Sequence, residues 1–97
     1  MIVRIVRMTI VPGMADEFVE IFTRTKDAIR NVEGCSHLEL LRDADHENVF
    51  TTLSHWHSVN DLDNYRNSDL FKNVWVRVKP LFARTAEAFS LEKFIEV

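Results

Sequence analysis

IVRIVRMTIV, residues 2–11, is the stretch of sequence that decides the fold. Its many β-branched residues favour a strand, and Pro12-Gly13 predicts the end of that strand. Alternate residues of a strand face opposite sides, and here both sides are mostly apolar, which is typical of a strand covered on both faces. One side carries Ile2, Arg4, Val6, Met8 and Ile10, and the other carries Val3, Ile5, Arg7, Thr9 and Val11.

Downstream of this strand the hydrophobic pattern changes period. Apolar residues spaced by three and four predict an amphipathic helix over residues 14–32, with Gly34 as its stop. Two apolar segments, at about 35–42 and 48–56, then flank a polar turn and predict a β-hairpin.

The last third of the chain predicts two more helices and one more strand. Ser58 and Ser68 are expected to cap the helices, and Pro80 is expected to end the second at about Lys79. Residues 87–97 alternate again and predict a strand. The order β-α-β-β-α-β predicts an α+β, ferredoxin-like sandwich in which helices cover one face of a four-stranded antiparallel sheet.

That architecture leaves the second face of the sheet without a cover from the same chain. A bare face carrying Val3, Ile5 and Val11 would be an unusually large apolar patch. We therefore expect a homodimer in which two copies pack sheet to sheet.

Length and composition narrow the classes of protein. A chain of 97 residues and 11.4 kDa predicts one domain over residues 1–97. The net charge of −3 gives no basic surface for nucleic acid, and no apolar run reaches the ~18 residues of a membrane helix. The single cysteine cannot form an internal disulfide, which is typical of the reducing cytoplasm.

Besides these elements, the chain contains four short segments that carry a resemblance: Val11-Pro12-Gly13, Glu33-Gly34-Cys35, Trp56-His57-Ser58 and Leu62 to Phe71. On these the sequence resembles the antibiotic biosynthesis monooxygenase family of the dimeric α+β barrel superfamily. The resemblance covers nearly the whole chain and implies a dimeric barrel. It also implies one of several functions found in that superfamily: cofactor-free oxygenation of phenols or quinols, haem degradation, isomerisation, or no assigned activity.

The resemblance argues against haem and implies a reaction without a cofactor. The haem-degrading branch uses Asn, Trp and His at positions that match Val6, Tyr65 and Trp75 here, so none of the three is kept. Tryptophan has no lone pair to offer the iron as an axial ligand.

The resemblance also places a ligand cavity between the helices and the sheet. A cofactor-free oxygenase needs an apolar pocket and a few donors that stabilise an oxyanion. For the aromatic residues the alternative is ordinary core packing. For Arg4 it is pairing with a carboxylate or water, and for Thr52 it is the preference of threonine for strands. Tyr65 is the candidate for handling a proton, and the expected substrate-binding residues are Trp56, Trp75, Phe71, Thr52 and Arg4.

Four residues at odd positions of the hairpin form a second candidate cluster: Cys35, His37, His55 and His57. Side chains two apart in a strand share a face, so an odd-to-odd register would bring His37 and His55 together. Either histidine could act as a general base near neutral pH. The spacing matches no standard zinc pattern, so no metal is expected, and the alternative is a pair of ordinary histidines at the dimer face.

Three hypotheses for the function follow. The first is a cofactor-independent monooxygenase acting on a small aromatic, phenol- or quinol-like compound. The second is an isomerase or lyase acting on a small enolisable metabolite. The third is a non-catalytic, small-molecule-binding stress-response dimer.

Overall fold

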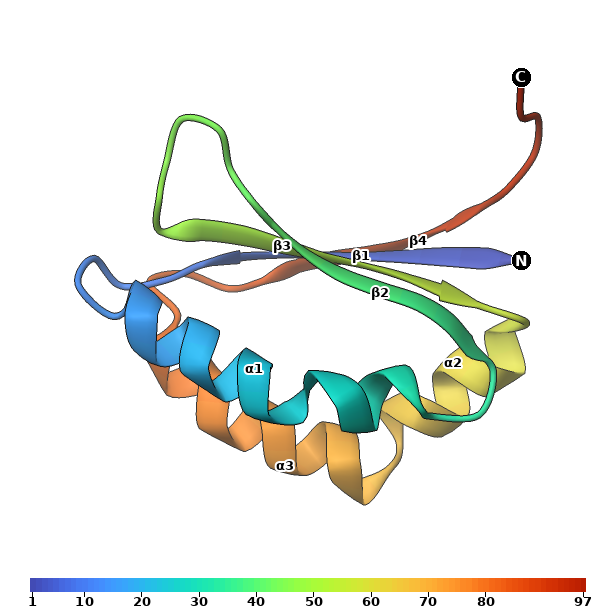
Figure 1. Cartoon of the computed structure of the whole chain (residues 1–97), viewed down its shortest axis with the longest axis horizontal. Coiled ribbons are helices and arrows are strands. Elements are labelled where there is room, and N and C mark those ends of the chain that lie inside the picture. The colour runs from blue at the N-terminus through green and yellow to red at the C-terminus, as the bar shows by residue number, and fades with distance from the viewer.

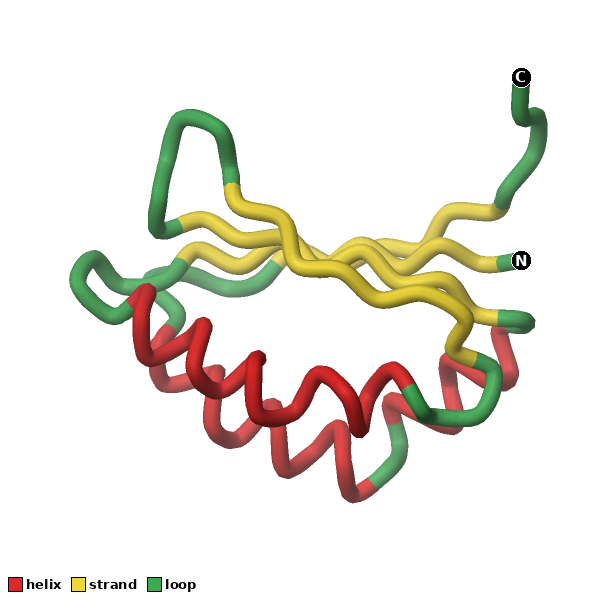
Figure 2. The backbone as a smooth tube through the Cα atoms, viewed as in Figure 1, coloured by secondary structure: helices red, strands yellow, loops and turns green.

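A computed structural model describes all 97 residues as a curved sheet with its helices on one face (Figures 1 and 2). The helices are α1 (Ala15–Arg30), α2 (Val59–Arg66) and α3 (Asp69–Val78). The antiparallel strands lie in the order β2-β3-β1-β4. This confirms the predicted α+β, ferredoxin-like arrangement. The strand bounds are β1 (Ile2–Thr9), β2 (Cys35–Arg42), β3 (Val49–Trp56) and β4 (Glu87–Glu92).

Two predicted ends near the N-terminus need correction. β1 ends at Thr9, because Ile10 makes only an isolated bridge to Phe82 before the Pro12-Gly13 turn. α1 ends at Arg30 and not at residue 32, so Gly34 does not terminate it directly. Gly34 has a φ of +88° and lies in the turn that leads into β2, where a Cβ would collide with the side chain of Asp61.

The two predicted serine caps are confirmed. Ser58 Oγ accepts a hydrogen bond from the Asp61 amide at 3.1 Å, and Ser68 Oγ accepts one from the Phe71 amide at 3.2 Å. α3 ends at Val78, where Pro80 forces a short 3₁₀ turn over Lys79–Leu81.

The final strand is shorter than the predicted 87–97 and ends at Glu92. Its only neighbour is β1, which starts at Ile2, and the last backbone contact is the Lys93 amide donating to the Met1 carbonyl at 3.2 Å. Residues 93–97 therefore have no strand left to pair with.

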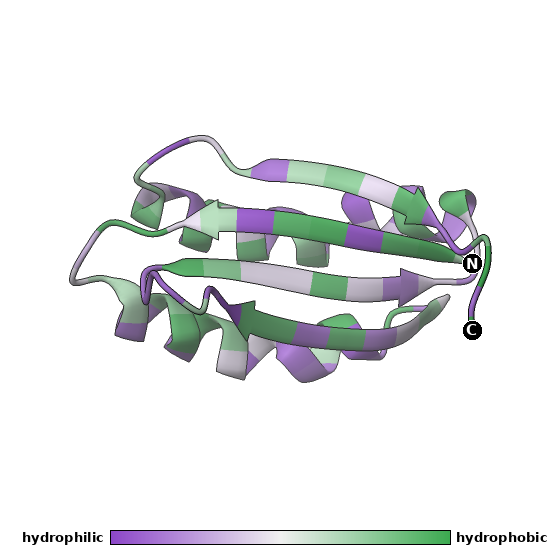
Figure 3. Ribbon diagram, turned by 90° about the horizontal axis from the view of Figure 1, so that it is seen from above, coloured by the Kyte–Doolittle hydropathy of each residue, from purple (hydrophilic) through white to green (hydrophobic).

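The register fixes which side chains share a face of the sheet. Ile5 of β1 lies between Leu53 of β3 and Phe89 of β4, so odd positions of these three strands face away from the helices. Figure 3 looks down on this open face. Val11, expected there as well, lies past the strand in the turn. The inner face carries the even positions of β1 and β3, among them Arg4, Val6, Met8, Thr52, Ser54 and Trp56.

A bulge at the start of β2 changes the face of one residue. Cys35 pairs with Trp56, whereas His37 pairs with the adjacent His55, so the register shifts between Cys35 and His37. Cys35 therefore lies buried on the inner face and His37 lies on the open face. The prediction that all four odd positions share a face is wrong at Cys35 for this reason.

The buried side chains form two clusters between the sheet and the helices. The larger one centres on Phe18 and Phe50, whose rings are 5.0 Å apart. The smaller one contains Cys35, Trp56 and Leu62 and lies where β3 meets α2. Residues of both clusters border the cavity described next.

Candidate functional site

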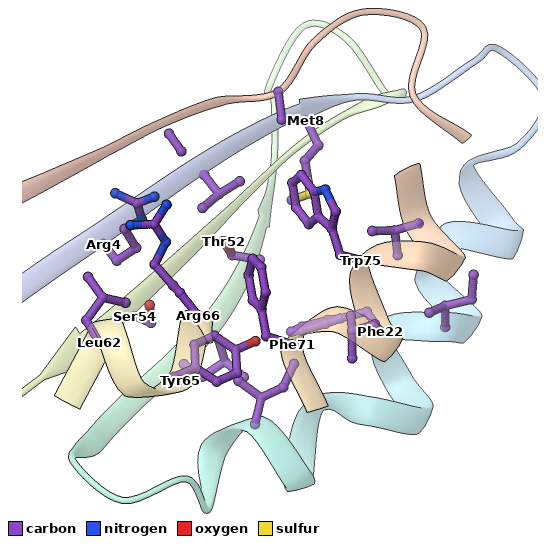
Figure 4. Close-up of a pocket in the computed structure, with 18 of the residues that line it drawn as sticks. Arg4, Met8, Phe22, Thr52, Ser54, Leu62, Tyr65, Arg66, Phe71 and Trp75 are labelled. Atoms are coloured by element: carbon purple, nitrogen blue, oxygen red, sulfur yellow. The ribbon is translucent and has the colours of Figure 1, made fainter. Parts of the chain in front are cut away.

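A cavity of about 230 Å³ lies between the inner face of the sheet and the three helices (Figure 4). β1 and β3 form its ceiling, and α1, α2 and α3 form its floor and walls. Sixteen of its 20 lining residues are hydrophobic, so the cavity favours an apolar ligand. Its size lies just below the roughly 300–1,000 Å³ of pockets for drug-sized ligands, which suits a compound of one or two rings.

A continuous strip of aromatic rings runs along the cavity. Tyr65 stacks on Trp56 at 5.0 Å, and the edge of Phe71 meets Tyr65 at 5.3 Å. Trp75 stacks on Phe71 at 5.6 Å and then meets Phe82 edge-on at 5.4 Å. The strip offers ring faces and edges to a planar ligand, at distances typical of favourable aromatic pairs.

The hydroxyl groups of the cavity have distinct roles. The buried Trp56 indole Nε1 donates to Ser54 Oγ at 2.9 Å, which fixes the ring against the sheet. Burial, with a smaller effect from Cys35, raises the pKa of Tyr65 to about 12. Tyr65 is therefore protonated at neutral pH and can donate a hydrogen bond, but it is a poor general base.

Two arginines line the same cavity. Arg4 comes from the inner face of β1 and donates to Ser90 Oγ at 3.1 Å, and Arg66 comes from the last turn of α2. Figure 4 shows the two guanidinium groups side by side. Burial and then the charge of Arg66 lower the pKa of Arg4, while Asp63 opposes that shift.

The chain is similar to known proteins in sequence and in fold. The model of the family described as "Antibiotic biosynthesis monooxygenase" matches residues 1–75. The chain belongs to the antibiotic biosynthesis monooxygenase family. No curated protein matches the chain.

Solved structures share the fold of this antibiotic biosynthesis monooxygenase family member at low sequence identity. A Caulobacter crescentus protein named after the same family has a TM-score of 0.90 and 23% identity, covering 97% of this chain and 90% of the other. A conserved protein of Methanosarcina mazei has a TM-score of 0.89 and 20% identity, covering 96% of this chain and 93% of the other. Rv0793 from Mycobacterium tuberculosis has a TM-score of 0.89 and 21% identity, covering 98% of this chain and 96% of the other. At these identities the likeness shows the fold alone.

Most of the site residues expected from the sequence lie together in this family member. One tyrosine, two tryptophans, a phenylalanine, a threonine and an arginine all line the cavity: Tyr65, Trp56, Trp75, Phe71, Thr52 and Arg4. Arg4 forms no ion pair with a carboxylate, and its side-chain hydrogen bond goes to the Ser90 hydroxyl.

His37 and His55 are brought together, but on the opposite face of the sheet from the cavity. Their rings are 4.8 Å apart, and His37 Nε2 lies 3.0 Å from Glu39 Oε1. Burial, His37 and then Lys93 lower the pKa of His55. Neither histidine lines the cavity, so neither reaches a ligand bound there in the same chain.

Ser54 and Arg66 also line the cavity and are not among the residues predicted for it, although the sequence holds a signal for both. Ser54 lies between Thr52 and Trp56 in the alternation of β3 and so shares their face. Arg66 lies four residues after Leu62, which places both on one side of α2.

Other candidate sites are not assembled. No three His, Cys, Asp or Glu side chains lie close enough together to hold a metal ion. Burial raises the pKa of the Cys35 thiol, which fits a small buried residue better than a nucleophile. None of the helices combines the length and apolarity needed to cross a bilayer.

Proposed function

We propose that this family member is a cofactor-independent monooxygenase acting on a small aromatic compound of the phenol or quinol type. The observation that carries the proposal is the aromatic cavity between the sheet and the helices, with Tyr65 as a protonated donor in its lining. Apolar walls keep water from the reacting compound, and a fixed donor stabilises negative charge on an oxygen.

The chemistry balances with oxygen as the only co-reactant. A phenol loses its hydroxyl proton, and O₂ adds to the ring carbon opposite the oxygen. Loss of water from this adduct leaves a quinone, so one oxygen atom enters the product and the other leaves as water. All four electrons taken up by O₂ come from the substrate. Tyr65, Trp56, Phe71 and Trp75 hold the ring, and Tyr65 donates to the developing oxyanion.

Because the cavity lining contains no histidine, carboxylate or thiol, the proton of the phenol leaves to solvent. The lack of a base in the lining favours non-catalytic ligand binding as the second candidate function. It counts against an isomerase or lyase, which needs a base beside the carbon that loses its proton.

The dimer forms part of the proposal. A second copy of the chain covers the open face, where Phe89 is 48% and Leu91 51% exposed beside Ile5. Phe94 and Ile95 of the C-terminal tail are also exposed. The buried thiol of Cys35 suits a cytoplasmic protein.

Oxygen uptake tests the activity. Chelator-treated protein is mixed with a panel of phenols that carry a hydrogen on the ring carbon opposite the hydroxyl, and the Tyr65→Phe variant is expected to show a kcat about 10²-fold lower. Val76→Ala is the control, because Val76 is 72% exposed on the outer side of α3. Saturable binding without oxygen uptake would replace the oxygenase with the non-catalytic alternative.

Light scattering at micromolar concentration tests the dimer, with twice 11.4 kDa as the expected mass. Ile5→Glu on the open face is expected to halve that mass, whereas Val76→Glu is expected to leave it unchanged. A monomer in the unmodified protein would refute the sheet-to-sheet pairing.

A further inference from the structure

The charge of the cavity lining is unbalanced. Its only charged side chains are Arg4 and Arg66, from β1 and α2, and all its remaining lining residues are neutral. Neither arginine takes part in any of the four ion pairs of the chain. A mostly apolar cavity thus carries two positive charges, and no carboxylate of the chain forms an ion pair with either.

The arginines are also oriented as a pair. Arg4 is held through Ser90 Oγ, and the Arg66 guanidinium lies beside it in Figure 4. Like charges at close range repel, and the neighbouring Asp63 does not form an ion pair with either. An anion placed between the two guanidinium groups would relieve that repulsion.

We propose that Arg4 and Arg66 bind an anionic oxygen group of the aromatic ligand, either a carboxylate or a phenolate, while its ring lies along Tyr65, Phe71 and Trp75. This inference rests on the proposed function in that it describes the substrate of the same cavity. Planar guanidinium groups match the two oxygens of a carboxylate, and charge-assisted hydrogen bonds to them are roughly twice as strong as neutral ones.

The pair also accounts for a cavity without a base. Two nearby positive charges favour the ionised form of a phenol, so the phenolate can form by loss of its proton to water. A ligand that already carries a carboxylate binds as an anion without any proton transfer. In both cases the arginines select anionic aromatic compounds over neutral ones of the same shape.

Calorimetry with two matched probes tests the selection. The probes are 2-naphthoate and the neutral 2-naphthylmethanol, and 2-naphthoate is expected to bind at least about tenfold more tightly. Arg4→Gln and Arg66→Gln are expected to remove that preference and to leave the affinity for the alcohol within about twofold. Arg77→Gln, at an exposed position of α3 outside the cavity, is the control and is expected to retain the preference.

Arg66 is exposed on α2, so Arg66→Gln tests the proposal even if Arg4→Gln fails to fold. Equal affinity for the acid and the alcohol, no binding of either, or a preference that survives Arg66→Gln would each overturn the assignment.

A third probe, 2-naphthol, distinguishes the two anionic groups. If the site takes a phenolate, bound 2-naphthol ionises at a lower pH than free 2-naphthol, and Arg66→Gln reverses the shift. If bound 2-naphthol stays neutral while 2-naphthoate is preferred, the anion is a carboxylate.

None of these probes has a hydrogen on a ring carbon opposite a ring hydroxyl, where oxygen would add, so binding is measured apart from turnover. Anion preference without oxygen uptake from any phenol of the panel would support the arginine site and reject the oxygenase. Oxygen uptake without anion preference would support the oxygenase and reject the arginine site.

Discussion

Replacing Ser54 by alanine tests how the cavity wall is held in place. Ser54 Oγ is the acceptor for the indole Nε1 of Trp56 at 2.9 Å, and the Trp56 side chain is only 1% exposed. Without that oxygen the indole N–H is buried with no partner. Such an unpaired donor costs about 1–3 kcal/mol of free energy of unfolding. In a domain of this size each kcal/mol corresponds to roughly 4–8 °C in Tm.

Thermal and urea unfolding at one fixed protein concentration measure this effect. Thr52→Val is the matched control, because it removes a hydroxyl from the same wall of the cavity without taking the acceptor from Trp56. A second comparison makes Ser54→Ala in a Trp56→Phe background, where no indole N–H is left to satisfy. The cost of losing Ser54 is expected to fall below about 1 kcal/mol there.

The reasoning is refuted if Ser54→Ala costs no more than Thr52→Val. It is also refuted if Ser54→Ala costs the same in both backgrounds, because the penalty would then not come from the orphaned indole.

Two further predictions concern a backbone position and a titration. Gly34→Ala is expected to lower the free energy of unfolding, measured in urea, by about 1–3 kcal/mol, because φ is +88° and the new Cβ would meet Asp61. Gly13→Ala is the control and is expected to cost less, because a Cβ there meets no neighbouring atom. Tyr65 is the only tyrosine, so absorbance at high pH follows it alone, with an expected midpoint near pH 12 in the folded protein. Burial raises the pKa of Tyr65 in the folded protein above the unfolded value of about 10. The contribution of Tyr65 to stability is therefore complete below pH 10 and is lost as the pH rises towards 12. A midpoint near pH 10 in the folded protein would contradict this.

The fold could be predicted from the sequence wherever a local pattern decides the structure. The alternation in β1, the helical spacing around Phe18 and the caps at Ser58 and Ser68 all depend on neighbouring residues. The end of the last strand could not be predicted, because it depends on where its partner begins. β4 pairs only with β1, and the pairing stops at Glu92, opposite Ile2, the first residue of β1. Alternation continues in the sequence past Glu92, but strand formation needs a partner.

The candidate site could be predicted in part for a similar reason. The aromatic residues of the cavity follow from the inner face of β3 and the inner sides of α2 and α3. The separation of Cys35 from His37 depends on one bulge, which no local sequence pattern announces. The placement of His37 and His55 away from the cavity depends on the register of the whole sheet.

The aromatic strip has a practical consequence. The chain contains two tryptophans and one tyrosine, and all three line the cavity. The intrinsic fluorescence of the protein therefore originates entirely from the walls of the ligand cavity. Any occupant that lies along Trp56, Tyr65 and Trp75 alters the surroundings of every fluorophore, so unlabelled protein can be screened against compound libraries by emission alone.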